Sequence, residues 1–275
     1  MKKIKAVFFD IDGTIIEHSQ NMEEPRPSTI NAFYALKDKG IRVVVASGRT
    51  PQSVGHVTDF PFDGFISANG AINYADGNEI YIGGLTSSEA RWLWDYLKVN
   101  QVGFIFQGDA LFVYPDANGF GVKDYIDNVR HRSYEKRIIH CDNLDLDDLF
   151  FKVTVFYTSV AQKEKAIKDL SAKYCLMFSE INFGERRADR LGGEISSLRD
   201  TKGTGIEHLL HYWQIKPEDA IAFGDNSNDI DMFEIVEGYA MGNSVPELKK
   251  KAIEVIGPVD SDAISELLKR KGIID

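Results

Sequence analysis

The sequence predicts an α/β protein built on a doubly wound, mainly parallel sheet, with a second α+β domain inserted into it. Short apolar runs alternate with helix-like segments in both terminal parts of the chain, which is the pattern of parallel strands joined by right-handed crossovers. The middle of the chain instead carries the hairpin patterns of antiparallel strands. With 275 residues, the chain is long enough for two modest domains.

The N-terminal part begins with a fully apolar strand, AVFF, at residues 6–9. A helix is expected next over residues 28–40, where apolar residues recur at helical spacing. The β-branched run IRVVVA at residues 41–46 predicts a second strand, and FDGFIS at residues 62–67 predicts a third. This part therefore supplies one half of the predicted parallel sheet.

The C-terminal part repeats the alternation. KGTGIEHLLHYW predicts a helix over residues 202–213, AIAFGD a strand over 220–225, and NDIDMFEIV a helix over 228–236. A strand at YAMG, residues 239–242, follows, and further helix and strand patterns complete the series. Strands that alternate with helices in this way form a parallel sheet covered on both faces.

The middle part is expected to be a separate domain over residues 85–191, which leaves 1–84 and 192–275 as the other domain. Within it, VGFIFQGDALFVYP predicts a hairpin that turns at Gly108-Asp109. Strand-like FFKVTVFY and YCLMFSE enclose a helix-like segment. This mixture predicts an α+β domain inserted into the α/β domain.

The start of the inserted domain carries a helix signal. Thr86 and Glu89 have the spacing of a capping box, which predicts a helix beginning after Thr86. Paired glycines stand at both crossings between the domains, at residues 83–84 and 192–193. Because glycine gives the backbone unusual freedom, these pairs are expected to be flexible joints, although glycine pairs also occur in ordinary tight turns.

The bulk composition excludes several classes of protein. The formal net charge is −10, whereas nucleic-acid and anionic membrane surfaces attract basic patches. No stretch reaches the ~18 apolar residues of a membrane span, and two aspartates interrupt the N-terminal apolar run, so neither a membrane segment nor a signal peptide is expected. Two cysteines are too few for a disulfide framework. The expected location is the cytoplasm.

Polar side chains follow three of the predicted strands at the point where each strand ends. Asp10 and Asp12 follow the first strand and point to the same side, because residues two apart in an extended chain share a face. Ser47 follows the second strand, and Asp225 ends the strand AIAFGD. Since ligands bind beyond the carboxyl ends of parallel strands, these side chains are expected to converge on one site.

The expected site needs positive charge. At an effective dielectric constant of 20 and a separation of 4 Å, one pair of carboxylates repels by roughly 4 kcal/mol, and a bound divalent cation reverses that sign. Oxygen ligands without thiolate or imidazole favour Mg²⁺, held by carboxylates, substrate phosphate and water. Lys202, at a predicted helix start, is the candidate cation for the remaining negative charge, and Ser47 with the amides beside it can hold phosphate oxygens.

Four segments, in this order, resemble the four motifs of the haloacid dehalogenase (HAD) superfamily: FFDIDGTI at 8–15, VVVASGR at 43–49, Lys202-Gly203, and FGDNSNDIDMF at 223–233. The inserted domain resembles the cap of the Cof-type, or type IIB, sugar-phosphatase branch, and SANGAIN at 67–73 resembles the NG signature of that branch. The resemblance implies a Rossmann-like doubly wound parallel sheet core with an inserted α+β (type IIB) cap domain.

The resemblance also implies a role for each candidate residue. Asp10 is expected to be the nucleophile that forms an aspartyl-phosphate, and Asp12 the acid that protonates the leaving oxygen and later deprotonates water. Mg²⁺ is expected between Asp10, the backbone carbonyl of Asp12, and Asp225, with Asp229 supporting the metal shell or orienting Lys202. The residues expected to bind phosphate or substrate are Thr14, Ser47, Gly48, Arg49, Lys202 and Asn228.

The expected function is a Mg²⁺-dependent phosphatase that acts on a small phosphorylated metabolite, most simply a sugar phosphate, as a monomer or homodimer. The alternatives are a phosphomutase that uses the same intermediate and a non-catalytic phosphate-sensing protein, although sensing needs no proton shuttle at Asp12. Arg49 is either a substrate clamp or part of a salt bridge that stabilises its loop. Arg186, Arg187 and Arg190 form either a solvated charged face or a site that reads the substrate.

Overall fold

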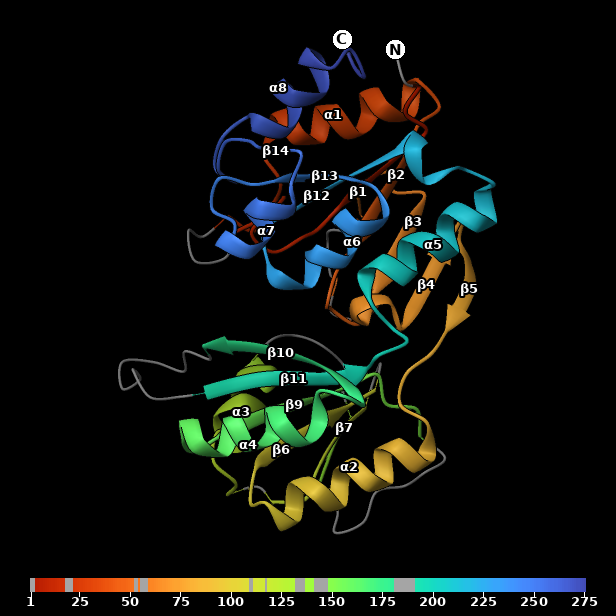
Figure 1. Cartoon of the computed structure of the whole chain (residues 1–275). Coiled ribbons are helices and arrows are strands. Elements are labelled where there is room, and N and C mark those ends of the chain that lie inside the picture. Colours follow the sequence, from red (N-terminus) through yellow and green to blue (C-terminus); the bar gives the residue numbers. More distant parts are fainter. Residues whose placement is uncertain are drawn as a thin grey trace. The chain divides into compact units, whose positions relative to one another are not determined.

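A computed structural model describes residues 3–17, 22–51, 54, 59–108, 111–116, 118–131, 137–140, 148–180 and 191–275. The chain forms two compact units, each with its own sheet (Figure 1). We call Met1–Ile82 together with Asp200–Asp275 the core unit, and Gly83–Arg199 the inserted unit. Among the helices of the described residues, none is long and apolar enough to cross a membrane.

The core unit contains an eight-stranded sheet in the order β14-β13-β12-β1-β2-β3-β4-β5. The first six strands of this order are parallel, and β4 and β5 add an antiparallel hairpin at one edge. The strands are β1 (Ala6–Phe9), β2 (Arg42–Ala46), β3 (Gly64–Ser67), β4 (Ile72–Ala75), β5 (Asn78–Ile82), β12 (Ala220–Gly224), β13 (Glu237–Ala240) and β14 (Glu254–Val255). The predicted doubly wound parallel sheet is confirmed.

Helices cover both faces of this sheet (Figure 1). Apolar side chains of α1 (Pro27–Asp38) and α8 (Ala263–Arg270) pack on one face, and those of α5 (Lys202–Trp213) and α6 (Ile230–Ile235) on the other. All four residues of β1 are fully buried between these layers, which explains its uninterrupted apolar sequence. The remaining elements are α7 (Pro246–Lys251) and the 3₁₀ turns η4 (Ala68–Gly70), η5 (Pro217–Asp219) and η6 (Ser227–Asp229).

The order of the strands reverses direction at β1. From β1 the chain proceeds outward through β2 and β3, and after the insertion it returns to β12 on the other side of β1 and proceeds through β13 and β14. Phe9 pairs with Val45 of β2 and with Phe223 of β12, so the carboxyl ends of the three strands lie side by side. A reversal of this kind is where open α/β sheets bind ligands.

The inserted unit contains a six-stranded sheet in the order β10-β11-β9-β6-β7-β8, in which β7 and β8 are the parallel pair. Apolar side chains of α2 and α4 pack on one face, and those of α3 pack with a second cluster that includes Ile105 and Phe156. The elements are β6 (Gly103–Gln107), β7 (Leu111–Tyr114), β8 (Arg137–His140), β9 (Lys152–Tyr157), β10 (Tyr174–Glu180), β11 (Leu191–Ser197), α2 (Ser87–Val99), α3 (Val122–His131) and α4 (Val160–Leu170).

The boundaries of the inserted unit differ from the predicted 85–191. The first junction lies at Ile82–Gly83, two residues earlier, and the second lies at Arg199–Asp200. The second differs because β11 pairs with β9 and β10 and so belongs to the inserted sheet. Gly192-Gly193 therefore lies inside a strand and is not a joint; a Cβ on Gly193 would stand 2.5 Å from the Met177 carbonyl oxygen, so this glycine allows close packing.

Hydrogen bonds join the two ends of the inserted unit. The guanidinium of Arg199 donates to both carboxylate oxygens of Glu89, at 2.9 and 2.8 Å, and to the carbonyl of Gly84 at 3.2 Å. Glu89 also completes the predicted capping box of α2, since it accepts from the Thr86 amide at 2.8 Å while its own amide donates to the Thr86 hydroxyl at 3.2 Å. The entry and exit of the inserted unit are thus held together by one carboxylate.

Replacing Glu89 with Gln should destabilise the inserted unit in a pH-dependent way. The hydrogen bonds from Arg199, reinforced by Thr86, lower the pKa of Glu89 from 4.5 to about 2. Because the folded-state pKa is the lower one, the stabilisation is complete above the unfolded-state pKa and is lost as pH falls from about 4.5 toward 2. We expect Glu89→Gln to cost about 1 kcal/mol at pH 7, a value reduced for partial solvent exposure.

The measurement is urea unfolding at pH 7, 5 and 3, followed by circular dichroism. The difference between wild type and Glu89→Gln should shrink as the pH falls. Glu164→Gln on α4, at an exposed position of the same unit, is the matched control and should leave stability unchanged at all three pH values. A pH-independent difference for Glu89→Gln would show that the ion pair does not stabilise the unit.

Candidate active site

The centre of the site is a lysine buried between two aspartates. Lys202 is the first residue of α5, and Thr201 caps this helix by accepting from the Thr204 amide at 3.2 Å. The Nζ atom of Lys202 lies 2.5 Å from Oδ1 of Asp10 and 2.6 Å from Oδ1 of Asp229. The side chains of Lys202 and Asp229 are 1% and 0% exposed. A cation is disfavoured at a helix N-terminus, so the two carboxylates supply the compensation that this position requires.

Asp229 holds the end of β12 as well as the lysine. Its Oδ2 atom accepts from the backbone amides of Asp225 and Asn226, at 2.8 and 2.9 Å, while Oδ1 accepts from Lys202. Gly224 allows this approach, because a Cβ there would stand 2.6 Å from the Cβ of Asp229. Both oxygens of Asp229 are therefore engaged by the protein, one by Lys202 and the other by the backbone after β12.

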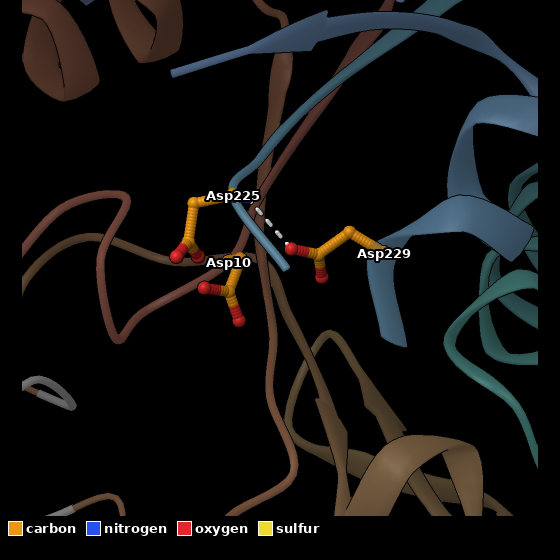
Figure 2. Close-up of side chains that lie close together, drawn as sticks. All are labelled: Asp10, Asp225 and Asp229. Atoms are coloured by element: carbon orange, nitrogen blue, oxygen red, sulfur yellow. Dashed lines mark hydrogen bonds between the residues drawn. The ribbon is translucent and has the colours of Figure 1, made fainter. Parts of the chain in front are cut away.

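Asp225 brings a third carboxylate to the same place. Carboxylate oxygens of Asp10, Asp225 and Asp229 all lie within 4.8 Å of one another, and Figure 2 shows Asp10 and Asp225 side by side at the ends of β1 and β12. Thr14 donates to Oδ1 of Asp225 at 3.4 Å. Gly13 passes directly beside this carboxylate with φ +87°, and a Cβ there would stand 2.3 Å from Asp225 Oδ2, so the position requires glycine.

The carboxylates show the electrostatic cost of this crowding. Burial raises the pKa of Asp10 well above its ordinary value, even though Lys202 acts in the opposite direction. Burial and the neighbouring charge of Asp229 raise the pKa of Asp225 to about 7. Burial alone would lower the pKa of Lys202, but attraction to Asp10 and Asp229 raises it above its ordinary range. Three carboxylates thus face one ammonium, and an additional cation fits this all-oxygen cluster.

Asp12 does not belong to this carboxylate cluster. It is half exposed, and both of its carboxylate oxygens accept from Arg49: from Nε at 2.8 Å and from Nη2 at 2.5 Å. The metal contact expected of Asp12 is its backbone carbonyl, and the role expected of its side chain is proton transfer. Arg49 was expected to be either a substrate clamp or part of a salt bridge, and in this structure it forms a salt bridge with Asp12.

The remaining phosphate-binding candidates meet around a residue that the predicted site does not include. Ser47 is buried after β2, and its hydroxyl accepts from the Arg49 amide at 3.1 Å. Asn228, in η6, donates from Nδ2 to Oδ1 of Asn69 at 3.1 Å. A Cβ on Gly48 would stand 3.0 Å from the same oxygen. The SANGAIN segment thus places Asn69 against two candidates, Gly48 and Asn228.

Sequence reasoning also missed Asn243. Its side-chain amide donates to the Gly13 carbonyl at 2.7 Å, and its Oδ1 accepts from the Val259 amide at 3.0 Å. The next residue, Ser244, donates to the Gly224 carbonyl at 3.2 Å. Both follow β13, so the rule that located Asp10 and Asp225 at strand ends could have found them. Arg186, Arg187, Arg190 and Cys141 lie outside the described residues.

The comparisons with known proteins agree with this architecture. Residues 7–268 match the haloacid dehalogenase-like hydrolase family, and the chain belongs to that family. It is 30% identical over 272 residues to "Putative phosphatase YkrA" of Bacillus subtilis, covering 98% of both chains. It is 26% identical over 239 residues to 5-amino-6-(5-phospho-D-ribitylamino)uracil phosphatase YbjI of Escherichia coli, covering 83% of this chain and 81% of that one.

Solved structures extend the likeness to the whole fold. A sugar phosphatase of HAD subclass IIB superimposes with a TM-score of 0.79 at 26% identity, covering 98% of this chain and 100% of the other. A protein from Geobacillus kaustophilus superimposes with a TM-score of 0.78, also at 26% identity, with the same coverage. The chain is therefore a phosphatase of the HAD superfamily with the subclass IIB architecture, as the motifs predicted.

Replacing Lys202 with Met should strongly destabilise the core unit. The substitution keeps most of the side-chain volume but leaves Asp10 and Asp229 buried without their cation, which costs about 3–5 kcal/mol. Urea unfolding without added metal measures this loss. Lys250→Met, at an exposed position of α7, is the matched control and should unfold like wild type. Equal stability of Lys202→Met and wild type would mean that the lysine does not neutralise this cluster.

Proposed function

We propose that this chain hydrolyses small phosphate monoesters through an aspartyl-phosphate formed on Asp10, with Mg²⁺ as cofactor. The observation that carries the proposal is the buried Lys202 ammonium, which contacts Asp10 directly and is held in turn by Asp229. A lysine in this position opposes the effect of burial, which favours the protonated form of Asp10, and it offers positive charge to an incoming phosphoryl group. Membership of the HAD family and the phosphatase relatives support the same function.

In the first step, a carboxylate oxygen of Asp10 attacks phosphorus, and the bond between phosphorus and the ester oxygen breaks. The leaving oxygen takes a proton from Asp12 and departs as an alcohol. In the second step, Asp12 accepts a proton from water as that water attacks the phosphoryl group, which releases phosphate and restores Asp10. The two steps need one aspartate that attacks phosphorus and one that exchanges protons. The buried position of Asp10 against Lys202 and the half-exposed position of Asp12 support this division.

The Arg49–Asp12 ion pair sets a condition on this mechanism. Asp12 can carry a proton to the leaving oxygen only if that carboxylate oxygen is no longer occupied by Arg49. A bound phosphoryl group offers Arg49 an alternative anionic partner, because a guanidinium binds phosphate and carboxylate in the same two-pronged way. We infer that Arg49 changes from Asp12 to the substrate when the ester binds. Both alternatives considered for Arg49 then apply, at different stages of the cycle.

The carboxylate cluster fits a magnesium ion. Asp10 and Asp225, with the backbone carbonyl of Asp12, are the proposed ligands, because Asp229 already uses both oxygens within the protein. When bound, Mg²⁺ would neutralise the repulsion between these carboxylates and a phosphate dianion. Around it, Lys202, Ser47, Gly48, Asn228 and Thr14 are the proposed donors to phosphate oxygens. The proposed substrate class is a small phosphorylated metabolite, most simply a sugar phosphate, and the proposed location is the cytoplasm.

Asp10→Asn should abolish turnover and leave the fold intact. An amide of the same shape lacks the nucleophilic charge, so hydrolysis of p-nitrophenyl phosphate should fall by at least about a thousandfold. Lys202 keeps Asp229 as a partner, so the thermal midpoint should stay close to that of wild type. Residual activity above about a tenth of wild type would exclude Asp10 as nucleophile.

Asp225→Asn should change the metal requirement. The amide is a weaker ligand for a hard cation, so the Mg²⁺ concentration at half-maximal activity should rise at least about tenfold. Wild-type activity should disappear with EDTA and return with excess Mg²⁺. Asp260→Asn, at an exposed position of the same unit, should titrate like wild type. An unchanged Mg²⁺ midpoint in Asp225→Asn would remove Asp225 from the proposed ligand set.

A further inference from the structure

Asn69 combines backbone strain with an unsatisfied buried donor. It lies in η4 between β3 and β4 with φ 55°, and the preceding Ala68 also has a positive φ, of 50°. This conformation costs Ala68 about 1 kcal/mol or more, whereas asparagine tolerates it better than other non-glycine residues. Asn69 is 4% exposed, and its side-chain Nδ2 atom has no hydrogen-bond partner among the described residues.

The surrounding contacts hold this strained turn in place. The Asn69 amide donates to the Ser47 carbonyl at 3.0 Å, and the Ala68 amide donates to the Arg49 carbonyl at 2.7 Å. Gly70 packs so closely on the residue before Lys202 that a Cβ would stand 2.1 Å from the Thr201 carbonyl oxygen. The turn is thus fixed to both the Ser47 loop and the start of α5, and a strained conformation persists only where its surroundings determine it in this way.

The amide of Asn69 has a defined orientation. Asn228 donates to its Oδ1 at 3.1 Å, which fixes the oxygen toward Asn228 and leaves the NH₂ group as the end without a partner. The absence of a side chain at Gly48 lets the backbone of that loop lie against the amide, 3.0–3.4 Å from where a Cβ would be. The unsatisfied donor therefore belongs to an amide that touches two residues proposed to bind phosphate, Gly48 and Asn228.

We propose that Asn69 is a further phosphate-binding residue, whose Nδ2 donates a hydrogen bond to an oxygen of the phosphoryl group. This inference rests on the proposed function, because it uses the same anion site. A phosphate oxygen in that place satisfies the donor that folding leaves buried, so the cost of burying that donor without a partner is recovered on binding. This proposal gives Asn69 of the SANGAIN segment a chemical role. The sequence alone showed only that this segment resembles the NG signature of the type IIB branch.

The test is binding of inorganic phosphate in the presence of Mg²⁺, measured by isothermal titration calorimetry, which needs no turnover. Asn69→Gly keeps the left-handed backbone and removes the donor, and it should weaken phosphate binding by about tenfold or more. Asn69→Asp keeps the shape but presents a negative oxygen to the anion, so its loss should be larger. The control is Gln214→Gly, which removes an exposed side chain from another residue with φ 55° and should bind phosphate like wild type.

Thermal unfolding separates this role from a structural one. Asn69→Gly removes an unsatisfied buried donor and backbone strain, but it also removes the hydrogen bond from Asn228, so its midpoint should stay close to that of wild type. A lower midpoint with unchanged phosphate affinity would overturn the proposal, as would failure of both Asn69 variants to fold while Gln214→Gly folds. Failure of the wild type to bind phosphate would also overturn it. The proposed function is judged independently, by turnover in wild type and its loss in Asp10→Asn.

Discussion

The buried ammonium of Lys202 is the interaction on which the rest of the site depends. Without it, the ends of β1 and β12 would bring buried carboxylates together with no ion-pair partner among the described residues, and the switch point of the sheet would be electrostatically unfavourable. With it, Asp10 and Asp229 share one charge, and Asp229 can use its second oxygen to fix the backbone after β12. The lysine thus links a helix start, two strand ends and the proposed nucleophile.

This arrangement also separates the two aspartates of the first motif by environment. Asp10 is buried beside an ammonium, whereas Asp12, two residues later, is half exposed and paired with Arg49, for which we propose a bound phosphate as the alternative partner. The same residue type can therefore serve as nucleophile in one place and as proton carrier in the other. The intervening Ile11 is fully buried in the apolar core, which anchors the segment between them.

Strand ends were predictable from the sequence because they follow long apolar runs. Asp10, Ser47 and Asp225 could be placed at one edge of a parallel sheet by that rule alone, and the need for a further cation pointed to Lys202 at a predicted helix start. Asn69 could not be given a role in this way. Its proposed importance comes from a left-handed turn and an unsatisfied side-chain amide, and both are visible only in the three-dimensional structure. The junction at Arg199 was missed for a related reason: the start of β11, Leu-Gly-Gly-Glu, lacks the β-branched residues that announce a strand.

The pairing of Arg199 with Glu89 and Gly84 means that the inserted unit leaves the core and returns to it at neighbouring points. On the core side of the same junction, Tyr81 donates to Asp200 at 2.8 Å, so the two crossings are fastened on both sides. Because the two ends of the insertion lie close together, the core unit is joined as it would be by a short turn between β5 and α5. The entropy cost of closing this connection then depends only weakly on the length of the insertion. Such a junction is modular: one catalytic core can carry different inserts over evolutionary time, and each insert can change its chemistry without disturbing the sheet that holds the aspartates.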